Sequence, residues 1–218
     1  MTRRPPQTAS IAHPHEDGKL FAPSADRNAQ AICALLTAVA PATGTALELA
    51  SGTGQHVVTY AAHLPGLYWQ PTEIAADRRT SIDAHVASSG LPNIAAAVTL
   101  NATTPGWGMQ HSGQALVMLS NLLHLISDRE AQVLITEAAI ALAPAGRFVI
   151  YGPFMRGGEL TSEGDTRFHA SLTEHDPEIG YKDDFDVLDL LQTAGLEMVE
   201  VVEMPANNLA LIAQKPAF

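Results

Sequence analysis

A stretch that turns from a buried strand into a glycine-rich loop constrains this chain more than any other. Residues 46–56 read ALELASGTGQH, in which large apolar residues alternate before two glycines one residue apart. The alternation predicts a buried strand over residues 45–50. Gly52 and Gly54 favour a tight turn that brings backbone N–H groups close to a ligand. Glu48 adds a carboxylate inside the apolar run, so the stretch predicts a strand that delivers a binding loop.

Strand and helix patterns alternate along the rest of the chain. Ser24 is the expected N-cap of the first helix, and Ser127 with Glu130 forms a predicted capping box. Helices are expected at residues 25–39, 55–64, 74–88, 128–142, 166–174 and 185–194. Strands are expected at residues 45–50, 66–70, 94–100, 115–120 and 147–151, followed by an antiparallel hairpin of 196–204 and 209–214. This order predicts an α/β fold with an open, doubly wound, mostly parallel seven-stranded sheet, in which ligands bind at the carboxyl ends of the strands.

The expected domain organisation is a leader followed by one domain. Residues 1–22 are rich in Pro, His and charge, and form a leader that is either loose or laid over the site. Residues 23–218 form the single domain. Within it, residues 152–183 interrupt the alternation with about thirty residues, where ordinary connections have about 4–6. Because long loops in compact domains are usually functional, we expect this insertion to line a substrate pocket.

Composition and charge exclude several classes of function. Hydrophobic residues make up 46% of the 218-residue chain, which is enough for a core. No apolar run approaches the roughly 20 residues that span a bilayer. The net charge of −11 argues against nucleic acid as the main partner. Cys33 is the only cysteine and no secretory signal follows the N-terminal arginines, so we expect a cytoplasmic protein with a small-molecule partner.

The glycine loop matches one family of binding motifs better than others. A dinucleotide fingerprint would need a third glycine where Val57 stands, and no phosphate-loop Lys-Ser or Lys-Thr follows. The pattern E-x-A-x-G-x-G, with Glu73 nineteen residues after Gly54, resembles the first motif of class I S-adenosylmethionine (SAM)-dependent methyltransferases. Ala50 stands where that motif usually has its first glycine. Further segments resemble an uncharacterised methyltransferase-like family long filed as a domain of unknown function: ADRN, WQPTEI, YGPF, TSEG, HDPEIG and MPANNL.

The resemblance implies a Rossmann-like methyltransferase fold, SAM as the cofactor, and a set of cofactor-binding residues. Gly52 and Gly54 leave room for the ligand, and Glu73 is placed to accept both ribose hydroxyls. Glu48 either orients the loop or holds the ammonium group of the ligand. The remaining implied contacts are Asn101 with the adenine amino group, Asn121 beneath the methionine part, and Arg27 with the methionine carboxylate.

The chemistry of methyl transfer leaves the catalytic residues open. Alignment and desolvation supply much of the acceleration, and a general base is needed only when the acceptor must lose a proton. His124 and Tyr151 are the candidates for catalysis, and Phe154, Glu163 and His169 are the candidates for substrate contact. No metal site is expected. The leading hypothesis is a methyltransferase acting on a small molecule; the alternatives are a non-catalytic SAM-binding or regulatory module and, third, a nucleotide-cofactor oxidoreductase.

Overall fold

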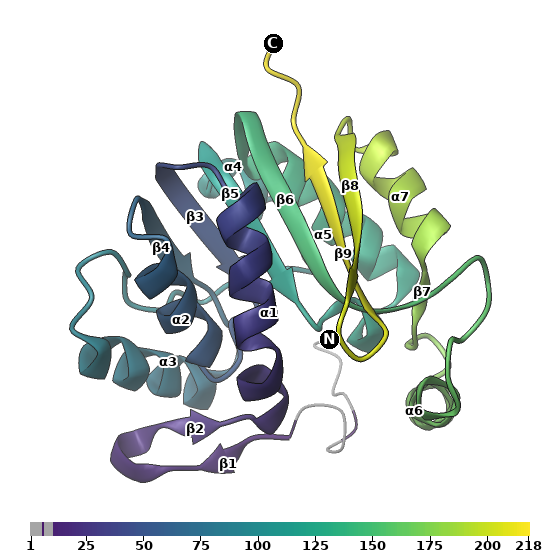
Figure 1. Ribbon diagram of the computed structural model, residues 1–218, viewed down its shortest axis with the longest axis horizontal. Helices are drawn as coiled ribbons and strands as arrows, with labels where there is room; N and C mark the ends of the chain where they lie inside the picture. Colours follow the sequence, from purple (N-terminus) through teal and green to yellow (C-terminus); the bar gives the residue numbers. More distant parts are fainter. Residues whose placement is uncertain (1–5, 7–10) are drawn as a thin grey trace.

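The computed structural model describes residue 6 and residues 11–218 of the chain. A seven-stranded sheet runs through its centre in the order β4-β3-β5-β6-β9-β8, with β7 paired to β6 (Figure 1). Strands β3 to β7 pair in parallel, whereas β9 is antiparallel to both β6 and β8. The strands are β3 (Gly44–Leu49), β4 (Leu67–Pro71), β5 (Gln114–Ser120), β6 (Leu142–Met155), β7 (Lys182–Asp183), β8 (Glu197–Met204) and β9 (Asn208–Gln214). The predicted doubly wound fold with an antiparallel C-terminal hairpin is confirmed.

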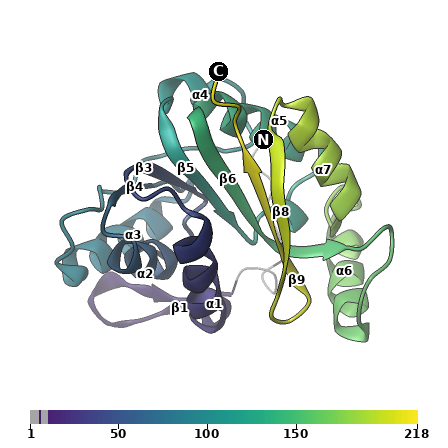
Figure 2. The ribbon, with the colours of Figure 1, turned by 45° about the horizontal axis from the view of Figure 1, so that its top comes forward.

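Helices cover both faces of the sheet (Figures 1 and 2). On one face, α1 (Pro23–Val39), α2 (Gln55–His63) and α3 (Ala76–Ser89) share a core that contains Ile32, Tyr60 and Ile82. On the other face, α4 (Trp107–Gln110), α5 (Asp128–Ala141) and α7 (Asp184–Thr193) enclose the second core. The remaining elements are the hairpin of β1 (His13–Pro14) and β2 (Leu20–Phe21), the 3-10 turns η2 (Glu16–Gly18) and η3 (Leu123–Leu125), and α6 (Glu163–His175).

Two helix starts test the capping predictions. Ser127 Oγ accepts the Glu130 N–H at 3.3 Å and Glu130 Oε2 accepts the Ser127 N–H at 2.8 Å, so the predicted capping box is confirmed. The prediction that Ser24 caps α1 is wrong, because the N-cap is Ala22 and the helix begins at Pro23. Proline favours the first helical position, since its fixed φ suits the helix and its missing N–H would have no partner there.

The expected strand at 94–100 is the main departure from the predicted sheet. Only two isolated parallel bridges form, between Trp69 and Ile94 and between Thr72 and Val98. Between them lies Pro71, which has no N–H to donate to the neighbouring segment. The carbonyl of Pro71 accepts the Val98 N–H, and the side chain of Gln70 donates to the Ala96 carbonyl instead. The segment therefore borders β4 without completing a regular ladder, and β7 from the insertion is the seventh strand.

Three other elements differ in extent from the prediction. Strand β6 continues past residue 151 to Met155, because β9 and β7 pair with its second half. Helix α6 begins at Glu163, where Ser162 accepts the Asp165 N–H as its N-cap. Helix α4 was not predicted, and its single turn follows Gly106.

The strand order reverses between β3 and β5, and this topological switch point is here called the divide of the sheet. The chain leaves β3 to form β4 on one side and later returns to form β5 on the other side. The loops that follow β3 and β5 therefore turn away from each other at the carboxyl edge of the sheet. This edge, at the bottom of Figure 1, also carries the β1–β2 hairpin, α6 and the tip of the β8–β9 hairpin.

Candidate functional site

A cavity of about 520 Å³ lies at the carboxyl ends of β3, β4 and β5. Of the predicted cofactor residues, five line the cavity and two, Arg27 and Gly54, do not. The five that line it are Glu48, Gly52, Glu73, Asn101 and Asn121. Its other walls come from the chain before and within α1, from the start of α3, and from the segments after β5, including Leu122, Leu125 and Ile126.

Glu48 is the most unusual side chain in this cavity. It is 1% exposed, and its Oε2 atom has no hydrogen-bond partner among the described residues. Burial raises the pKa of this carboxyl from 4.5 to about 8, a rise that the Ser51 side chain opposes and the nearby Glu73 increases. A cationic ligand would stabilise the ionised form of this buried carboxyl, because the cation would replace the hydration that burial removes.

The two glycines of the loop have different surroundings. Both have a left-handed backbone, with φ of +60° at Gly52 and +94° at Gly54. A Cβ atom on Gly54 would lie 2.7 Å from Cα of Ile82, so this glycine allows the loop to pack against α3. A Cβ atom on Gly52 would meet nothing closer than the Arg78 guanidinium at 3.6 Å. Gly52 therefore faces the cavity, whereas Gly54 lets two elements approach each other.

Glu73 ties the end of β4 to the glycine loop. Its Oε2 accepts the Gly52 N–H at 3.1 Å, and its Oε1 accepts the N–H groups of Ile74 and Ala75 at 2.8 and 3.1 Å. An ionised carboxylate has about four acceptor sites, so Oε2 keeps capacity for a hydroxyl donor. The side chain is 6% exposed and lines the cavity.

The backbone is strained on both sides of the divide between β3 and β5. Ala50 and Asn121 directly follow these strands and have φ of +50° and +55°. Asparagine tolerates this left-handed conformation, but alanine pays roughly 1–2 kcal/mol for it. Such outliers persist where the surrounding structure over-determines them, and they cluster at functional sites.

Asn101 already uses its amide oxygen within its own loop. Its Oδ1 accepts the N–H and the hydroxyl of Thr103, at 3.1 and 2.9 Å. The oxygen is therefore occupied, and the Nδ2 group is the part of the amide that remains as a donor.

Two further residues line the cavity that the sequence reasoning missed, His56 and Arg78. His56 is 7% exposed, and its Nε2 donates to the Ala25 carbonyl at 3.1 Å and to Asn28 Oδ1 at 2.7 Å. Burial lowers the pKa of His56 to about 4, against the opposing Ala25 hydrogen bond, so the imidazole is neutral. The signal available in the sequence was only position: His56 comes two residues after the glycines, and Arg78 lies in the first turn of α3.

The two candidates for catalysis lie outside the cavity lining. His124 in η3 is 4% exposed and has Phe168 and Tyr181 at ring-centroid distances of 5.7 and 6.2 Å. Burial, assisted by Lys182, lowers its pKa to about 3. Tyr151 is 2% exposed, and burial raises the pKa of its hydroxyl, which Asn28 opposes through a hydrogen bond.

The insertion residues also lie away from the cavity lining. Phe154 is 2% exposed in the core, and Glu163 is exposed, with Arg167 at 3.5 Å as its partner. His169 Nδ1 accepts the Tyr181 N–H at 3.1 Å. The insertion nevertheless supports a cavity wall, because its own small core of Leu172, Ile179 and Tyr181 packs against Leu125.

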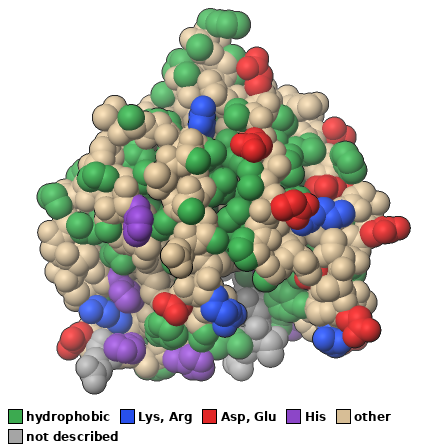
Figure 3. All heavy atoms as spheres, in the orientation of Figure 1, with side chains coloured by type: hydrophobic (Ala, Val, Ile, Leu, Met, Phe, Trp, Pro, Cys, Tyr) green, Lys and Arg blue, Asp and Glu red, His purple; other side chains and the backbone are tan. Residues whose placement is uncertain are grey.

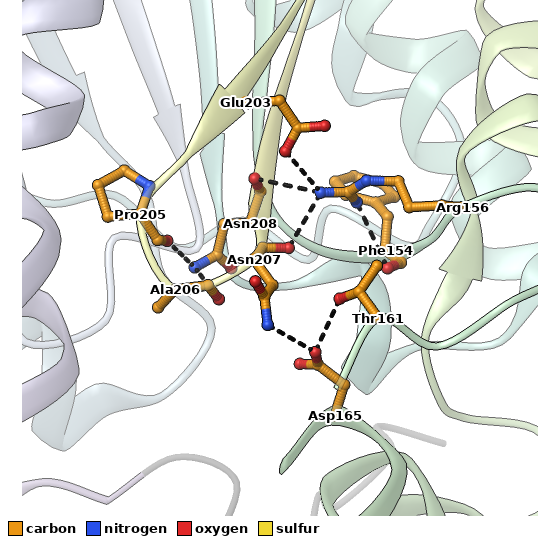
Figure 4. Close-up of polar contacts among 9 residues, drawn as sticks. All are labelled: Phe154, Arg156, Thr161, Asp165, Glu203, Pro205, Ala206, Asn207 and Asn208. Carbon is orange, nitrogen blue, oxygen red and sulfur yellow. Dashed lines mark hydrogen bonds and ion pairs between the residues drawn. The ribbon is translucent and has the colours of Figure 1, made fainter. Parts of the chain in front are cut away.

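The insertion is fastened to the tip of the β8–β9 hairpin, as Figure 4 shows. Asp165 Oδ2 accepts Asn207 Nδ2 at 3.1 Å, and Arg156 Nη2 contacts Glu203 Oε2 at 3.3 Å and the Asn207 carbonyl at 3.1 Å. Asp165 Oδ1 also accepts the Tyr181 hydroxyl at 2.9 Å. Burial opposes ionisation of Asp165, but four side-chain hydrogen bonds outweigh it and lower the pKa.

Within the described part of the chain, no helix is long and apolar enough to cross a membrane. The same residues contain no group of three or more His, Cys, Asp or Glu side chains arranged to hold a metal ion. His13 and His15, in the N-terminal hairpin segment, are exposed. Histidine and basic side chains gather along the lower edge of the face drawn in Figure 3.

A family model described as "Protein of unknown function (DUF938)" matches residues 19–215. The chain belongs to the DUF938 family. The match begins at the loop between β1 and β2 and ends just after β9, so it spans the whole sheet and every wall of the cavity except Ile11 and Ala12.

Solved structures extend the likeness of this DUF938 chain beyond its family. An O-methyltransferase family protein from Burkholderia thailandensis is 20% identical with a TM-score of 0.73; 89% of this chain matches 58% of that one. Human N-acetylserotonin methyltransferase in complex with SAM is 15% identical with a TM-score of 0.72, over 88% of this chain and 53% of that one. An O-methyltransferase family 2 protein from Planctomyces limnophilus in complex with apigenin is 15% identical with a TM-score of 0.71, over 88% and 60%. The chain thus spans little more than half the length of the structures whose fold it shares.

Proposed function

We propose that this chain is a SAM-dependent methyltransferase that acts on a small-molecule acceptor. The observation that carries the proposal is Glu48, whose buried and unpaired carboxylate oxygen belongs to a cavity at the divide of the sheet. SAM combines an ammonium and a sulfonium cation with a ribose and an adenine. The cavity offers a matching set: a carboxylate for a cation, an open left-handed glycine, and a second carboxylate with acceptor capacity.

Each part of the site has a defined task in this proposal. Glu48 would hold the ammonium group, Gly52 would leave space beside the backbone, and Glu73 would accept ribose hydroxyls. Asn101 would approach the adenine through Nδ2, because its oxygen is occupied by Thr103. When bound, SAM supplies a methyl group on a positively charged sulfur. The chain itself orients the ligands and excludes water, which favours an in-line displacement.

The volume and lining of the cavity support a small acceptor. A cavity of about 520 Å³ falls in the range that holds a cofactor-sized or drug-sized ligand. Apolar side chains after β5, Leu122, Leu125 and Ile126, form one wall. The related folds that were solved with SAM and with apigenin support the same pairing of cofactor and small molecule.

Isothermal titration calorimetry tests the cofactor site by measuring how many protons are released when SAM binds. At pH 7 the Glu48 carboxyl is mostly neutral in the empty protein, and an arriving cation favours its ionised form. SAM binding measured in two buffers of different ionisation enthalpy should therefore release up to about one proton in the wild type. The variant Glu48→Gln should bind more weakly and release none. Binding without proton release in the wild type would remove Glu48 from the ammonium site, and no binding of SAM or S-adenosylhomocysteine would refute the cofactor.

Turnover separates the enzyme from a non-catalytic SAM-binding module with the same fold. A panel of small hydroxyl, thiol and amine compounds, incubated with SAM carrying a labelled methyl group, should yield a labelled product. Tight SAM binding with no product across the panel would favour the non-catalytic alternative.

A further inference from the structure

The hydrogen bonds that the structure describes between the N-terminal hairpin and the helices lie on its second arm. The segment in question, residues 11–22, is here called the strap. Three hydrogen bonds with side chains hold its second arm: Leu20 N–H to Ser81 Oγ at 2.7 Å, His85 Nε2 to the Leu20 carbonyl at 3.1 Å, and Ala22 N–H to Gln55 Oε1 at 2.6 Å. Within the described residues, every hydrogen bond from the strap to the helices comes from Leu20 or Ala22.

The first arm of the strap faces the cavity without such anchors. Ile11 and Ala12 line the cavity, and Ile11 is 49% exposed. The arm is tied to the second arm by two residue pairs, His13 with Phe21 and Pro14 with Leu20. A two-stranded hairpin of this size is marginally stable by itself. Among the described contacts, the first arm thus has fewer attachments to the helices than the second arm.

Two of the three anchors on the second arm, Ser81 and Gln55, lead directly to the glycine loop. Ser81 is completely buried, and its hydroxyl accepts from Leu20 and donates to the Thr53 carbonyl at 2.7 Å. Gln55 Oε1 accepts from Ala22 and also from the Thr53 hydroxyl at 2.9 Å. Two short relays, through Ser81 and through Gln55, thus join the strap to Thr53, which lies between Gly52 and Gly54.

We propose that the strap is a lid over the cofactor cavity whose closure is coupled to the glycine loop through Ser81 and Gln55. This inference rests on the proposed function for the identity of the occupant. A ligand that orders the glycine loop also orders Thr53. Thr53 then fixes the positions of Ser81 and Gln55, the two side chains that accept the N–H groups of Leu20 and Ala22 in the strap. Because such coupling is reciprocal, a closed strap also raises the affinity for the ligand. A lid across the cavity mouth also obstructs the path by which the ligand leaves.

Hydrogen exchange on the full chain tests the lid directly, with S-adenosylhomocysteine as the probe. Saturating ligand should slow amide exchange in residues 11–22 of the wild type. The variant Ser81→Ala breaks one relay and should lose much of this protection, with ligand dissociation in stopped flow faster by roughly three- to tenfold, the range set by one buried hydrogen bond. Ser88→Ala is the matched control on the same helix, because its exposed hydroxyl donates to the Ala84 carbonyl within α3.

A second variant keeps the test independent of the stability of α3. Ile11→Ser removes only the cavity-facing side chain of the free arm and should raise the dissociation rate while leaving the melting temperature unchanged. Ligand binding with unchanged exchange in residues 11–22, or with dissociation rates equal in all three variants and the wild type, would overturn the lid and leave the proposed function standing. Absence of binding would overturn both.

Discussion

The carboxylate of Glu73 accepts a hydrogen bond from the backbone N–H of Gly52, with 3.1 Å between oxygen and nitrogen. This bond connects the end of β4 with the loop that follows β3, across the carboxyl edge of the sheet. One side chain thus shapes the loop and faces the cavity. Its loss should affect both ligand affinity and the loop itself.

Replacing Glu73 with alanine should weaken binding of SAM or S-adenosylhomocysteine by about 1–3 kcal/mol, the range for hydrogen bonds that involve a charged partner. Calorimetry measures the affinity, and far-UV circular dichroism should show an unchanged helix content. Glu73→Gln is the isosteric comparison: its single amide oxygen can accept the Gly52 N–H or those of Ile74 and Ala75, but not all three. Unaltered affinity together with reduced stability would mean that Glu73 serves only the start of α3.

The two glycines of the loop should respond differently to a methyl group. Gly54→Ala places Cβ 2.7 Å from the backbone of Ile82 and should destabilise the fold by more than about 2 kcal/mol. In Gly52→Ala the new Cβ makes only an ordinary contact with Arg78 at 3.6 Å, so the variant should cost about 1 kcal/mol for its left-handed backbone while reducing ligand affinity. Urea unfolding of both variants decides the point. Equal losses of stability would contradict the division between a packing glycine and a cavity glycine.

Stability should depend on pH through Glu48. Its pKa is about 8 in the folded protein and lower in the unfolded chain, so the folded state holds a proton that unfolding releases. The stabilisation is fully present below pH 4.5 and is lost as the pH rises toward 8, with a slope of up to about 1.4 kcal/mol per pH unit. Chemical unfolding between pH 5 and 8 should show this slope in the wild type and a flatter one in Glu48→Gln. Parallel profiles for the two proteins would assign the pH dependence to other groups.

Asp165 should hold the insertion against the β8–β9 hairpin. Asp165→Ala removes the partners of Tyr181, Ser162 and Asn207 and should cost about 1–2 kcal/mol. Because the pKa of Asp165 is lowered, its contribution is present above its unfolded pKa and is lost as the pH falls. Hydrogen exchange should increase in α6, while SAM affinity stays within a few-fold. Glu163→Ala is the control on the same helix, and a comparable effect there would contradict a specific role for Asp165.

The fold was predictable where local chemistry and the global pattern agree. The Ser127–Glu130 capping box and the apolar runs of β3 and β5 needed no knowledge of distant partners. The strand expected at 94–100 needed such knowledge, because its pairing depends on Pro71 of another strand. Two neighbouring residues each favour a start for α1: Pro23 as the first helical residue and Ser24 as the N-cap. The helix begins at Pro23.

The site was predictable only where topology determines it. Glu48, Gly52, Glu73 and Asn121 lie at or shortly after the ends of strands, and Asn101 follows the segment that borders β4, so the carboxyl edge brings all five to one cavity. His56 and Arg78 occupy ordinary first-turn positions of helices, so their spacing carries no signal. The sequence does not distinguish whether the apolar residues of the insertion line a substrate pocket or pack into a separate hydrophobic core. In the described part of the chain these residues form a separate small core, which reaches the cavity lining through Leu125.

The position of β8 at the border of the sheet has a consequence for how copies of this chain meet. A border strand presents unpaired N–H and C=O groups on which another chain could grow. Glu197, Glu200 and Glu203 are exposed along β8, so two such borders approaching each other bring like charges together. The carboxylates of Glu197 and Glu200 thus guard a strand whose backbone would otherwise be open to pairing with a second copy of the chain.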